Sequence, residues 1–302
     1  MKNYIEIFGF KIYYYAIMIV MGIFCGIFTA CVLAKRRGYK SETIFDIVIV
    51  AIPLAIIGAR LYYVLFSLDK YNSFWDVINI RSGGLAVYGG FIGGAIGVLI
   101  MCKVKKLSVL RFFDIGAPCF ILGQAIGRWG NFFNQEAYGN LVTNPKMQWF
   151  PYAVQIDAEG GKWFQATFFY ESMWNFIVFA ALVVFAYMYF NKADGLVMAG
   201  YLVLYGIGRT FIEGLRADSL YLGNTPIRVS QLLSVLFIIT GLIFAALVIL
   251  NYYFPEKLKP FKDKFNSIFK KPKEEAAAET PEEKNKPPKV AEASEDKPKD
   301  NE

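Results

Sequence analysis

The sequence contains no histidine among its 302 residues. This absence excludes serine and cysteine nucleophiles that are activated by an imidazole, and every zinc site that needs a histidine ligand. The four cysteines, Cys25, Cys31, Cys102 and Cys119, lie singly in or at the ends of apolar runs, without CxxC spacing. They are expected to be small buried side chains rather than metal ligands or disulfide partners. No metal and no organic cofactor is predicted.

Charged residues are also scarce, at 19% of the chain, whereas 56% of the residues are hydrophobic. Soluble domains do not show this apolar excess, so the chain is predicted to be an all-α, polytopic membrane protein. Seven apolar runs are each close to the roughly 20 residues that span about 30 Å of hydrocarbon. These predicted transmembrane helices cover residues 12–34, 44–66, 85–102, 112–126, 166–190, 196–212 and 229–251.

The fourth run is the weakest of the seven. It is short, contains Pro118 and continues directly into a polar segment. Irregular backbone is tolerated at membrane depth only where it is buried in protein or lines a wet cavity. The far end of this run is therefore predicted to be irregular and to line such a cavity.

Lysines and arginines gather after the first and third runs, which predicts that these two loops are cytoplasmic. The N-terminus would then lie outside and the C-terminus inside, and residues 140–165 would form a small outer cap. The first run is expected to remain as an anchor, because its positive charges follow the apolar stretch. The basic residues concerned are Lys35, Arg36, Arg37, Lys40, Lys103, Lys105, Lys106 and Arg111.

The composition changes at Pro255, which predicts a transmembrane domain at residues 1–254 and a cytoplasmic tail at 255–302. The tail carries 12 basic and 12 acidic residues and is expected to be largely disordered. Its first part, residues 257–273, alternates lysines with apolar residues, as suits a segment on an anionic membrane surface. No nucleic-acid-binding signature is present.

Thirteen consecutive residues, 127–139, read GRWGNFFNQEAYG and place charged and amide side chains at the end of the fourth run. An arginine within a hydrophobic segment costs about 2.5 to 3.5 kcal/mol on insertion scales. Arg128 is therefore expected to face a cavity and to bind an anion there.

A second polar stripe lies in the sixth run, where Tyr205, Arg209 and Glu213 follow one another at steps of four. This spacing places them on one face of a helix, and Arg216 continues that face. One interpretation is a buried Arg209–Glu213 ion pair that only fixes helix packing. The other is an anion site, because two arginines against one carboxylate leave positive charge for a ligand.

Other polar residues in the apolar runs allow more than one interpretation. Arg60 could extend to the outer membrane interface or point at the same cavity. Tyr170 and Glu171, near an outer boundary, could be structural or belong to the site. Asp46 and Asp114 lie near the cytoplasmic ends and are expected to be structural.

The third run is rich in glycine. Three overlapping GxxxG pairs begin at Gly89, and small residues at this spacing allow neighbouring helices to approach closely. Gly83 and Gly84 precede the run, and free amide groups at a helix start can hold a phosphate. These two glycines are therefore predicted to bind the anion, with Tyr88 one turn inside them.

The chain resembles the prolipoprotein diacylglyceryl transferases of bacterial inner membranes. The resemblance rests on GRWGNFFNQEAYG at 127–139, RSGGLAVYGG at 81–90 and YGIGRTFIEGLR at 205–216. It implies transfer of the diacylglyceryl group from phosphatidylglycerol to the thiol of the lipobox cysteine of a prolipoprotein. Such a reaction forms a thioether, releases glycerol phosphate and takes place among membrane lipids.

By motif position, the resemblance implies that Arg128 binds phosphatidylglycerol, with Asn131 and Asn134 as hydrogen-bond partners. Glu136 would order these amides or the thiol. Arg209 matches an essential arginine of the family and is assigned to the leaving phosphate, with the reverse assignment of the two arginines open. The predicted substrate-binding set also includes Gly83, Gly84, Tyr205, Glu213, Arg216, Arg60 and Gly139.

Gly139 is expected to permit a tight turn where the chain leaves the bilayer. Members of the family often carry a histidine at the position of Tyr88. Since this chain has none, the acceptor of the thiol proton is left open between Tyr88, Glu136 and water.

A transporter or flippase for an anionic lipid or organic phosphate is the alternative, because it would use the same arginines without breaking a bond. The sequence has no inverted repeat, and its charged residues gather toward one side rather than along a path. The enzyme is therefore the favoured interpretation.

Overall fold

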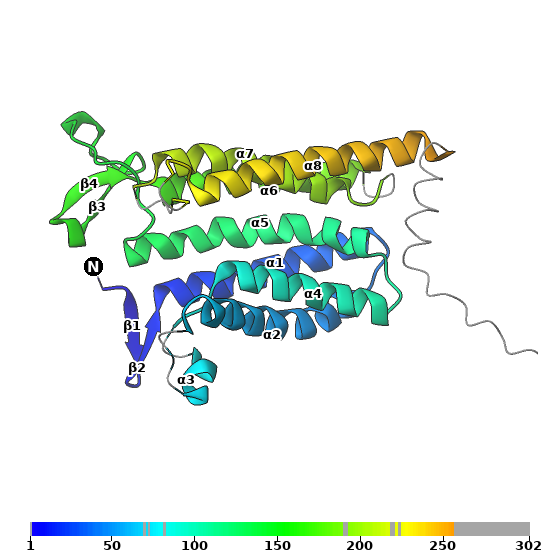
Figure 1. Cartoon of the computed structure of the whole chain (residues 1–302), viewed down its shortest axis with the longest axis horizontal. Helices are drawn as coiled ribbons and strands as arrows, with labels where there is room; N and C mark the ends of the chain where they lie inside the picture. The colour runs from blue at the N-terminus through cyan, green and yellow to red at the C-terminus, as the bar shows by residue number, and fades with distance from the viewer. Residues whose placement is uncertain are drawn as a thin grey trace, which may run out of the picture. The chain divides into compact units, whose positions relative to one another are not determined.

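A computed structural model of the chain describes residues 2–68, 71, 73–80, 83–189, 193–217, 221–222 and 225–256. The tail from residue 257 onward, with its expected membrane-surface segment, lies outside the described residues, as does Arg81 of the third-run motif. The long helices (Figure 1) are α1 (Tyr14–Arg36), α2 (Ser41–Leu65), α4 (Val87–Val104), α5 (Val109–Asn134), α6 (Thr167–Tyr189), α7 (Leu196–Leu215) and α8 (Val229–Tyr253).

The seven predicted transmembrane helices are confirmed within the part of the chain that the structure describes. Each long helix has 18 to 26 residues and is apolar enough to cross a membrane. Their outward faces carry large exposed apolar side chains, for example Phe28 and Phe211, as expected where lipid is the solvent. The direction in which the helices cross the membrane stays a prediction.

The prediction of a short fourth helix with an irregular far end is wrong. Helix α5 is continuous from Val109 to Asn134, through Pro118 and through most of the polar motif. The polar side chains find partners on the next helix, since Trp129 Nε1 donates to Ser172 Oγ at 3.1 Å. With such partners available the backbone has no need to unwind, and a proline is tolerated in a packed membrane helix.

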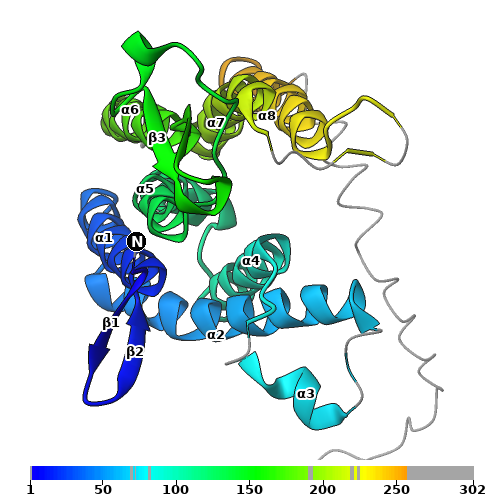
Figure 2. The ribbon, with the colours of Figure 1, turned by 90° about the vertical axis from the view of Figure 1, so that its left-hand side faces the viewer.

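Helix α5 lies at the centre of the bundle, beside α1 and α6, and α2 pairs closely with α4 (Figure 2). The α2–α4 contact depends on the predicted glycine face. A Cβ atom at Gly97 would lie 2.6 Å from the Ala51 Cα atom, and one at Gly93 would collide with the Leu54 carbonyl. The packing role predicted for these glycines is confirmed.

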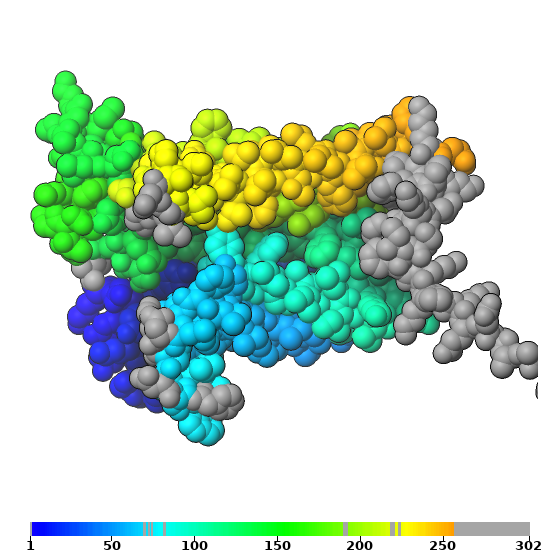
Figure 3. Space-filling model, in the orientation of Figure 1, coloured from blue at the N-terminus to red at the C-terminus, as the bar shows by residue number. Residues whose placement is uncertain are grey.

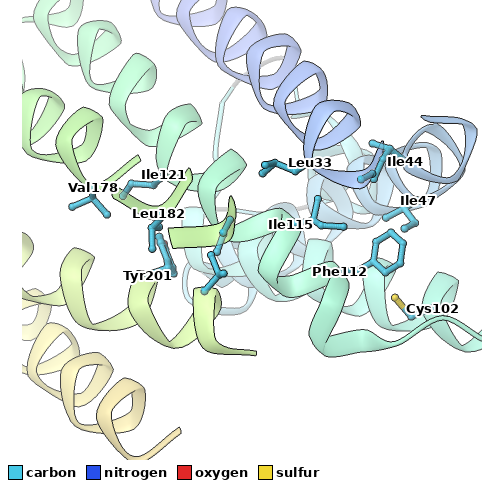
Figure 4. Packing of buried hydrophobic residues seen from close by; sticks show 14 residues of the cluster. Leu33, Ile44, Ile47, Cys102, Phe112, Ile115, Ile121, Val178, Leu182 and Tyr201 are labelled. Atoms are coloured by element: carbon cyan, nitrogen blue, oxygen red, sulfur yellow. The ribbon is translucent and has the colours of Figure 1, made fainter. Parts of the chain in front are cut away.

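The apolar core extends from the middle of the bundle to the end that is remote from the GRWGNFFNQEAYG motif. Figure 4 shows how its side chains pack. Among the described residues it joins six helices, α1, α2, α4, α5, α6 and α7, through buried side chains such as Cys102. Its labelled members are Leu33, Ile44, Ile47, Cys102, Phe112, Ile115, Ile121, Val178, Leu182 and Tyr201.

A group of charged residues closes this same end. The buried Asp114 carboxylate accepts the amide N–H groups of Gly195 at 2.7 Å and Met198 at 2.9 Å, which are free donors at the start of α7. Arg37 bridges Asp114 at 3.0 Å and Asp194 at 3.2 Å, and Arg111 reaches Asp194 at 2.7 Å. We call Arg37, Arg111, Asp114 and Asp194 the staple, because they tie α1, α5 and the start of α7 together.

Asp46 pairs with Lys105, between α2 and the end of α4. Asp46 and Asp114 therefore make structural contacts, as the sequence predicts.

The shorter elements gather at the opposite end (Figures 1 and 3). Strands β1 (Tyr4–Ile7) and β2 (Phe10–Tyr13) form an antiparallel hairpin with Ile5 opposite Ile12. Helix α3 (Phe74–Ile78) lies between α2 and α4 in the sequence. The predicted cap contains the antiparallel strands β3 (Ala153–Ile156) and β4 (Lys162–Gln165), together with two short 3₁₀ helices at Pro145–Met147 and Asp157–Glu159.

The cap is attached to α5 and α6 by aromatic packing and backbone contacts. The Phe150 ring lies 5.1 Å from that of Phe169 and 6.5 Å from that of Trp129, centroid to centroid. The Tyr170 hydroxyl donates to the Tyr152 carbonyl. The cap therefore has a defined position over the ends of α5 and α6.

Candidate active site

Five charged side chains, four from the helices α5, α6 and α7 and one from the residue directly after α7, form a continuous chain of ion pairs, which we call the ladder. On α6, Glu171 forms an ion pair with Arg128 of α5 at 2.6 Å, and it accepts a hydrogen bond from Arg209 of α7 at 2.8 Å. Arg209 also reaches Glu213 at 2.7 Å, and Arg216 lies 4.0 Å from Glu213. Alternating arginines and glutamates thus link the ends of α5, α6 and α7.

The ladder is buried, but its charges do not cancel. Glu171 and Glu213 are 3% and 1% exposed, so each carboxylate needs its arginines. The sequence allowed either a structural Arg209–Glu213 ion pair or an anion site with surplus positive charge. The structure contains the ion pair, and it also places three arginines against two carboxylates. These five side chains carry a net charge of +1.

Glu171 was undecided from the sequence, and the structure places it at the centre of the ladder. The sequence signal was weak, because Glu171 is 43 residues from Arg128 and 38 from Arg209. Its neighbour Tyr170 turns toward the cap instead. The two residues of this predicted pair therefore belong to different environments.

The polar side chains of the GRWGNFFNQEAYG motif are hydrogen-bonded to one another. Arg128 Nη1 donates to Asn131 Oδ1 at 3.2 Å. The amide nitrogens of Asn131 and Asn134 point at Glu136 Oε1, at 2.8 and 3.4 Å. These bonds connect Glu136, which is exposed, to Arg128 and hence to the ladder.

The chain reverses directly after α5, which is why Glu136 can fold back over the helix end. Gln135 and Ala137 both have left-handed backbones, with φ of 53° and 58°, a conformation that is uncommon for residues other than glycine. The Gln135 side chain accepts the amide N–H of Asp157 in the cap at 3.0 Å. The cap therefore helps to hold the reversed segment.

A cavity of about 650 Å³ runs between α1, α2, α4 and α5. Its wall is mainly apolar, and its lining extends along α5 from Phe112 to Asn131, which is about 28 Å at 1.5 Å per residue. Polar groups occur mostly toward one end. They are Tyr15, Gln124, Arg128, Asn131 and Tyr205. The cavity thus has the length and polarity of an amphiphile.

Tyr15 is a member of this set that sequence reasoning missed. It lies in the first turn of α1, and a Cβ atom on Gly130 of the motif would lie 2.5 Å from its ring. Beside it, Tyr14 stacks on Phe133 at 4.8 Å between centroids. A run of tyrosines at a helix start indicates a membrane interface, so the sequence carried no signal for a site role.

Two further predicted residues lie close to the ladder. Tyr205 lines the cavity, and its ring stacks on that of Tyr201 at 5.6 Å. Gly139 has an ordinary negative-φ backbone, so a left-handed turn is not the reason for glycine there. A Cβ atom at Gly139 would lie 2.8 Å from Thr167 Cγ2 and 2.9 Å from the Leu215 carbonyl oxygen. Close packing of the cap against α6 and α7 requires the glycine.

Arg60, Gly83 and Gly84 lie outside both the cavity lining and the ladder. Arg60 is 6% exposed and donates only to backbone carbonyl groups, between α3 and the start of α4. The amide of Gly83, predicted to hold a phosphate, already donates to the Ile80 carbonyl at 3.2 Å. The backbone of Gly84 packs on Arg60, so these glycines and Arg60 form a unit of their own.

Tyr88 lies in the first turn of α4 and is 48% exposed. Its ring is 6.3 Å from that of Tyr62. The preceding residue, Val87, lines the cavity. Tyr88 is therefore close to the cavity wall but is not joined to the ladder by any of the ion pairs described above.

Within the described residues, no cluster of three or more cysteine, aspartate and glutamate side chains is placed to hold a metal ion. The groups available for chemistry are the guanidinium, carboxylate, amide and phenol groups of the ladder and the motif. They can bind an anion, stabilise a leaving anion and accept a proton.

The described part of the chain has seven membrane-length helices, and five of them line an apolar cavity with an arginine toward its polar end. These features define a multi-pass membrane protein with an amphiphile-sized site. A family model described as prolipoprotein diacylglyceryl transferase matches residues 2–247. The chain belongs to this family.

Curated relatives agree over most of their length. A phosphatidylglycerol–prolipoprotein diacylglyceryl transferase 1 of Clostridium perfringens is 46% identical over 80% of this chain and 92% of its own. Proteins with the same name, without the final number, are 47% identical in Finegoldia magna and 42% identical in Clostridium kluyveri. Those two matches cover 79% and 78% of this chain, and 92% of each relative.

Proposed function

We propose that this protein transfers the diacylglyceryl group of phosphatidylglycerol to the cysteine thiol of a prolipoprotein lipobox segment. The product is a thioether, and glycerol phosphate is released. The observation that carries this proposal is an apolar cavity of lipid length that ends at Arg128, within a chain of the transferase family. The family match gives no support to the transporter alternative.

The donor lipid would place its acyl chains along α5 and its phosphate at Arg128. A phosphodiester carries one negative charge, which matches the net charge of +1 on the ladder. Arg128 can bond two phosphate oxygens with its planar fork, and Asn131 and Tyr15 add polar groups on the same wall. The lipid headgroup and the acyl chains would then be bound by different parts of the cavity.

The reaction is a displacement at a glycerol carbon of the lipid. The sulfur–carbon bond forms as the carbon–oxygen bond to phosphate breaks, the thiol loses a proton, and glycerol phosphate leaves as an anion. Arg209 is assigned to this leaving anion, because it shares Glu171 with Arg128 and lies one ion pair away from it. A cation fixed in place before reaction needs little reorganisation when the negative charge develops.

Glu136 is the favoured acceptor of the thiol proton. It is exposed, and its Oε1 atom is held by Asn131, which also accepts from Arg128. A thiol that approaches the lipid head beside Arg128 would meet this carboxylate. Tyr88, on the neighbouring wall, is assigned to positioning the substrates.

The site would lie on the extracytoplasmic side of the bacterial inner membrane. The lysines and arginines that predict cytoplasmic loops follow the C-terminal ends of α1 and α4. The ladder lies at the opposite end of the bundle, where α5 and α7 end. The tail is proposed to be a separate cytoplasmic segment.

Mass spectrometry of a lipobox peptide tests the activity directly. The purified protein is incubated with the peptide in vesicles that contain phosphatidylglycerol. We expect the peptide to gain a diacylglyceryl mass on its cysteine, and expect no gain for a peptide with cysteine replaced by serine or for vesicles of neutral lipid. An unmodified peptide, with lipid moved between leaflets, would instead indicate the transporter.

A further inference from the structure

Arg60 is a buried arginine whose entire donor capacity is spent on backbone. Its Nε–H group donates to the Val77 carbonyl at 2.7 Å. Nη1 donates to Gly83 at 2.7 Å and Gly84 at 2.9 Å, and Nη2 donates to Asp76 at 2.7 Å and Asn79 at 2.9 Å. A guanidinium has five N–H groups, so each one has a carbonyl partner.

The five carbonyls belong to a segment that cannot satisfy them itself. Three come from the end of α3, which has only five residues and therefore leaves its last carbonyls without helical donors. Two come from consecutive glycines with left-handed backbones, φ 86° at Gly83 and 77° at Gly84. The buried Arg60 side chain supplies donors to all five of these carbonyls.

The two glycines differ in what surrounds them. A Cβ atom on Gly84 would lie 2.5 Å from Arg60 Nη1 and 2.9 Å from the Tyr63 ring. At Gly83 a Cβ atom would have nothing within 4 Å. Both positions favour glycine for their backbone conformation, but only Gly84 is packed against the guanidinium.

This segment leads directly to the cavity wall. The amide of Ala86 donates to the carbonyl of Ala59, the residue before Arg60, at 3.0 Å. Val87, which lines the cavity, and Tyr88 follow at once in the first turn of α4. The position of that turn is thus set by α2 through Arg60 and its neighbour.

We propose that Arg60 is a positioning residue for the transfer reaction. It clamps the end of α3 and the Gly83–Gly84 turn to α2, and so holds Val87 and Tyr88 at the mouth of the cavity. It touches neither the lipid nor the thiol. This inference rests on the proposed function, because the clamp acts on the wall of the proposed lipid site.

Hydrogen exchange and transfer kinetics together test the clamp, first with Arg60→Ala and Arg60→Lys in the full chain. We expect amides around Gly83 and Ala86 to exchange at least about tenfold faster, because their segment loses its partners. Turnover should fall on the order of tenfold to a hundredfold, as misplacement of a wall by about 1 Å can cause, while the KM for phosphatidylglycerol stays within about threefold. Added guanidinium ion should partly restore turnover of Arg60→Ala. Lysine, with three donors, should restore little.

The two glycines provide a matched pair in which Arg60 stays in place. Gly84→Ala and Gly83→Ala impose the same backbone conformation on alanine, but only the first places a methyl group against the guanidinium. We expect Gly84→Ala to resemble Arg60→Ala in exchange and turnover, and Gly83→Ala to lose clearly less. Adding Gly84→Ala to Arg60→Ala should cost less than it costs in the native chain, because the nearest colliding atom, Arg60 Nη1, is gone and only the contact with the Tyr63 ring remains.

The outcomes separate the clamp from the proposed function. Unchanged exchange in Arg60→Ala, or equal losses for the two glycine variants, would overturn the clamp. Faster exchange with unchanged turnover would overturn its role in positioning. If the native chain adds no diacylglyceryl mass, the proposed function fails and the positioning role fails with it, although the exchange data still show whether Arg60 holds the segment. Arg111→Ala, an exposed change at the staple, serves as the control and should leave exchange near Gly83 unaltered.

Discussion

Arginines meet carboxylates at both ends of the helical bundle, and the two groups differ in charge and in surroundings. In the staple, two arginines face two aspartates, and Asp114 also accepts two backbone N–H groups of α7. In the ladder, three arginines face two glutamates, and Arg128 lines an apolar cavity. Buried ion pairs as such therefore say little about function. An excess of positive charge beside a cavity is what indicates an anionic ligand.

The largest expected difference between the two ends is in catalysis, and Arg128→Ala should show it. This change removes the ladder's only cation that lines the cavity, while Glu171 keeps its bond to Arg209. Transfer should become undetectable, a loss of about 1000-fold or more, because the phosphate loses its binding and stabilising group. The peptide assay measures this, and circular dichroism in detergent should show a folded protein. Full activity of this variant would refute the assignment of Arg128.

The staple should respond in the opposite way. Arg37→Ala leaves Asp114 buried without its cation, and breaking a buried pair in this way costs about 3 to 5 kcal/mol. Thermal unfolding should occur at a clearly lower temperature than for the native chain. The protein that remains folded should keep most of its specific activity at low temperature. A variant with native stability and lost transfer would mean that the staple, too, belongs to the site.

Local spacing made the ladder partly predictable from the sequence. Arg209 and Glu213 lie one turn apart on α7, so their pairing follows from helical geometry, and Arg216 follows directly after the last residue of that helix. The pairing of Arg128 with Glu171 joins two helices, and no periodicity encodes which faces of α5 and α6 meet. Tyr15 was missed for the same reason, since its partner Gly130 is on another helix.

Apolar runs of membrane length revealed all seven helices, but they placed the end of α5 eight residues too early. Hydropathy falls where the motif begins, whereas the helix continues because neighbouring helices satisfy its polar groups. Arg60 shows a second limit of prediction from the sequence. Its five carbonyl partners are backbone atoms of α3 and the loop after it. The pattern of side chains in the sequence does not indicate hydrogen bonds to backbone atoms.

The balance of charge in the ladder can be shifted directly by Glu171→Gln. This variant keeps the shape of the side chain and raises the net charge of the ladder from +1 to +2. Phosphatidylglycerol should bind at least as tightly, so its KM should not rise. Turnover should fall about 10- to 100-fold, because Arg128 and Arg209 lose the group that orients them and the anionic product leaves a more positive site more slowly. Steady-state kinetics across lipid concentrations would separate the two effects, and a raised KM with native turnover would contradict them.

The smallest expected effect concerns Tyr88, which follows the cavity-lining Val87 and lies outside the ladder. Tyr88→Phe keeps the ring that packs near Tyr62 and removes only the hydroxyl. If Glu136 accepts the thiol proton, this variant should retain turnover within about tenfold of the native chain, the loss of one hydrogen bond from a positioning group. Glu136→Gln should lose considerably more, because the amide can still bond to Asn131 and Asn134 but cannot accept a proton. Measuring both variants with the same peptide and vesicles decides between the two residues, since the larger loss identifies the group that handles the proton.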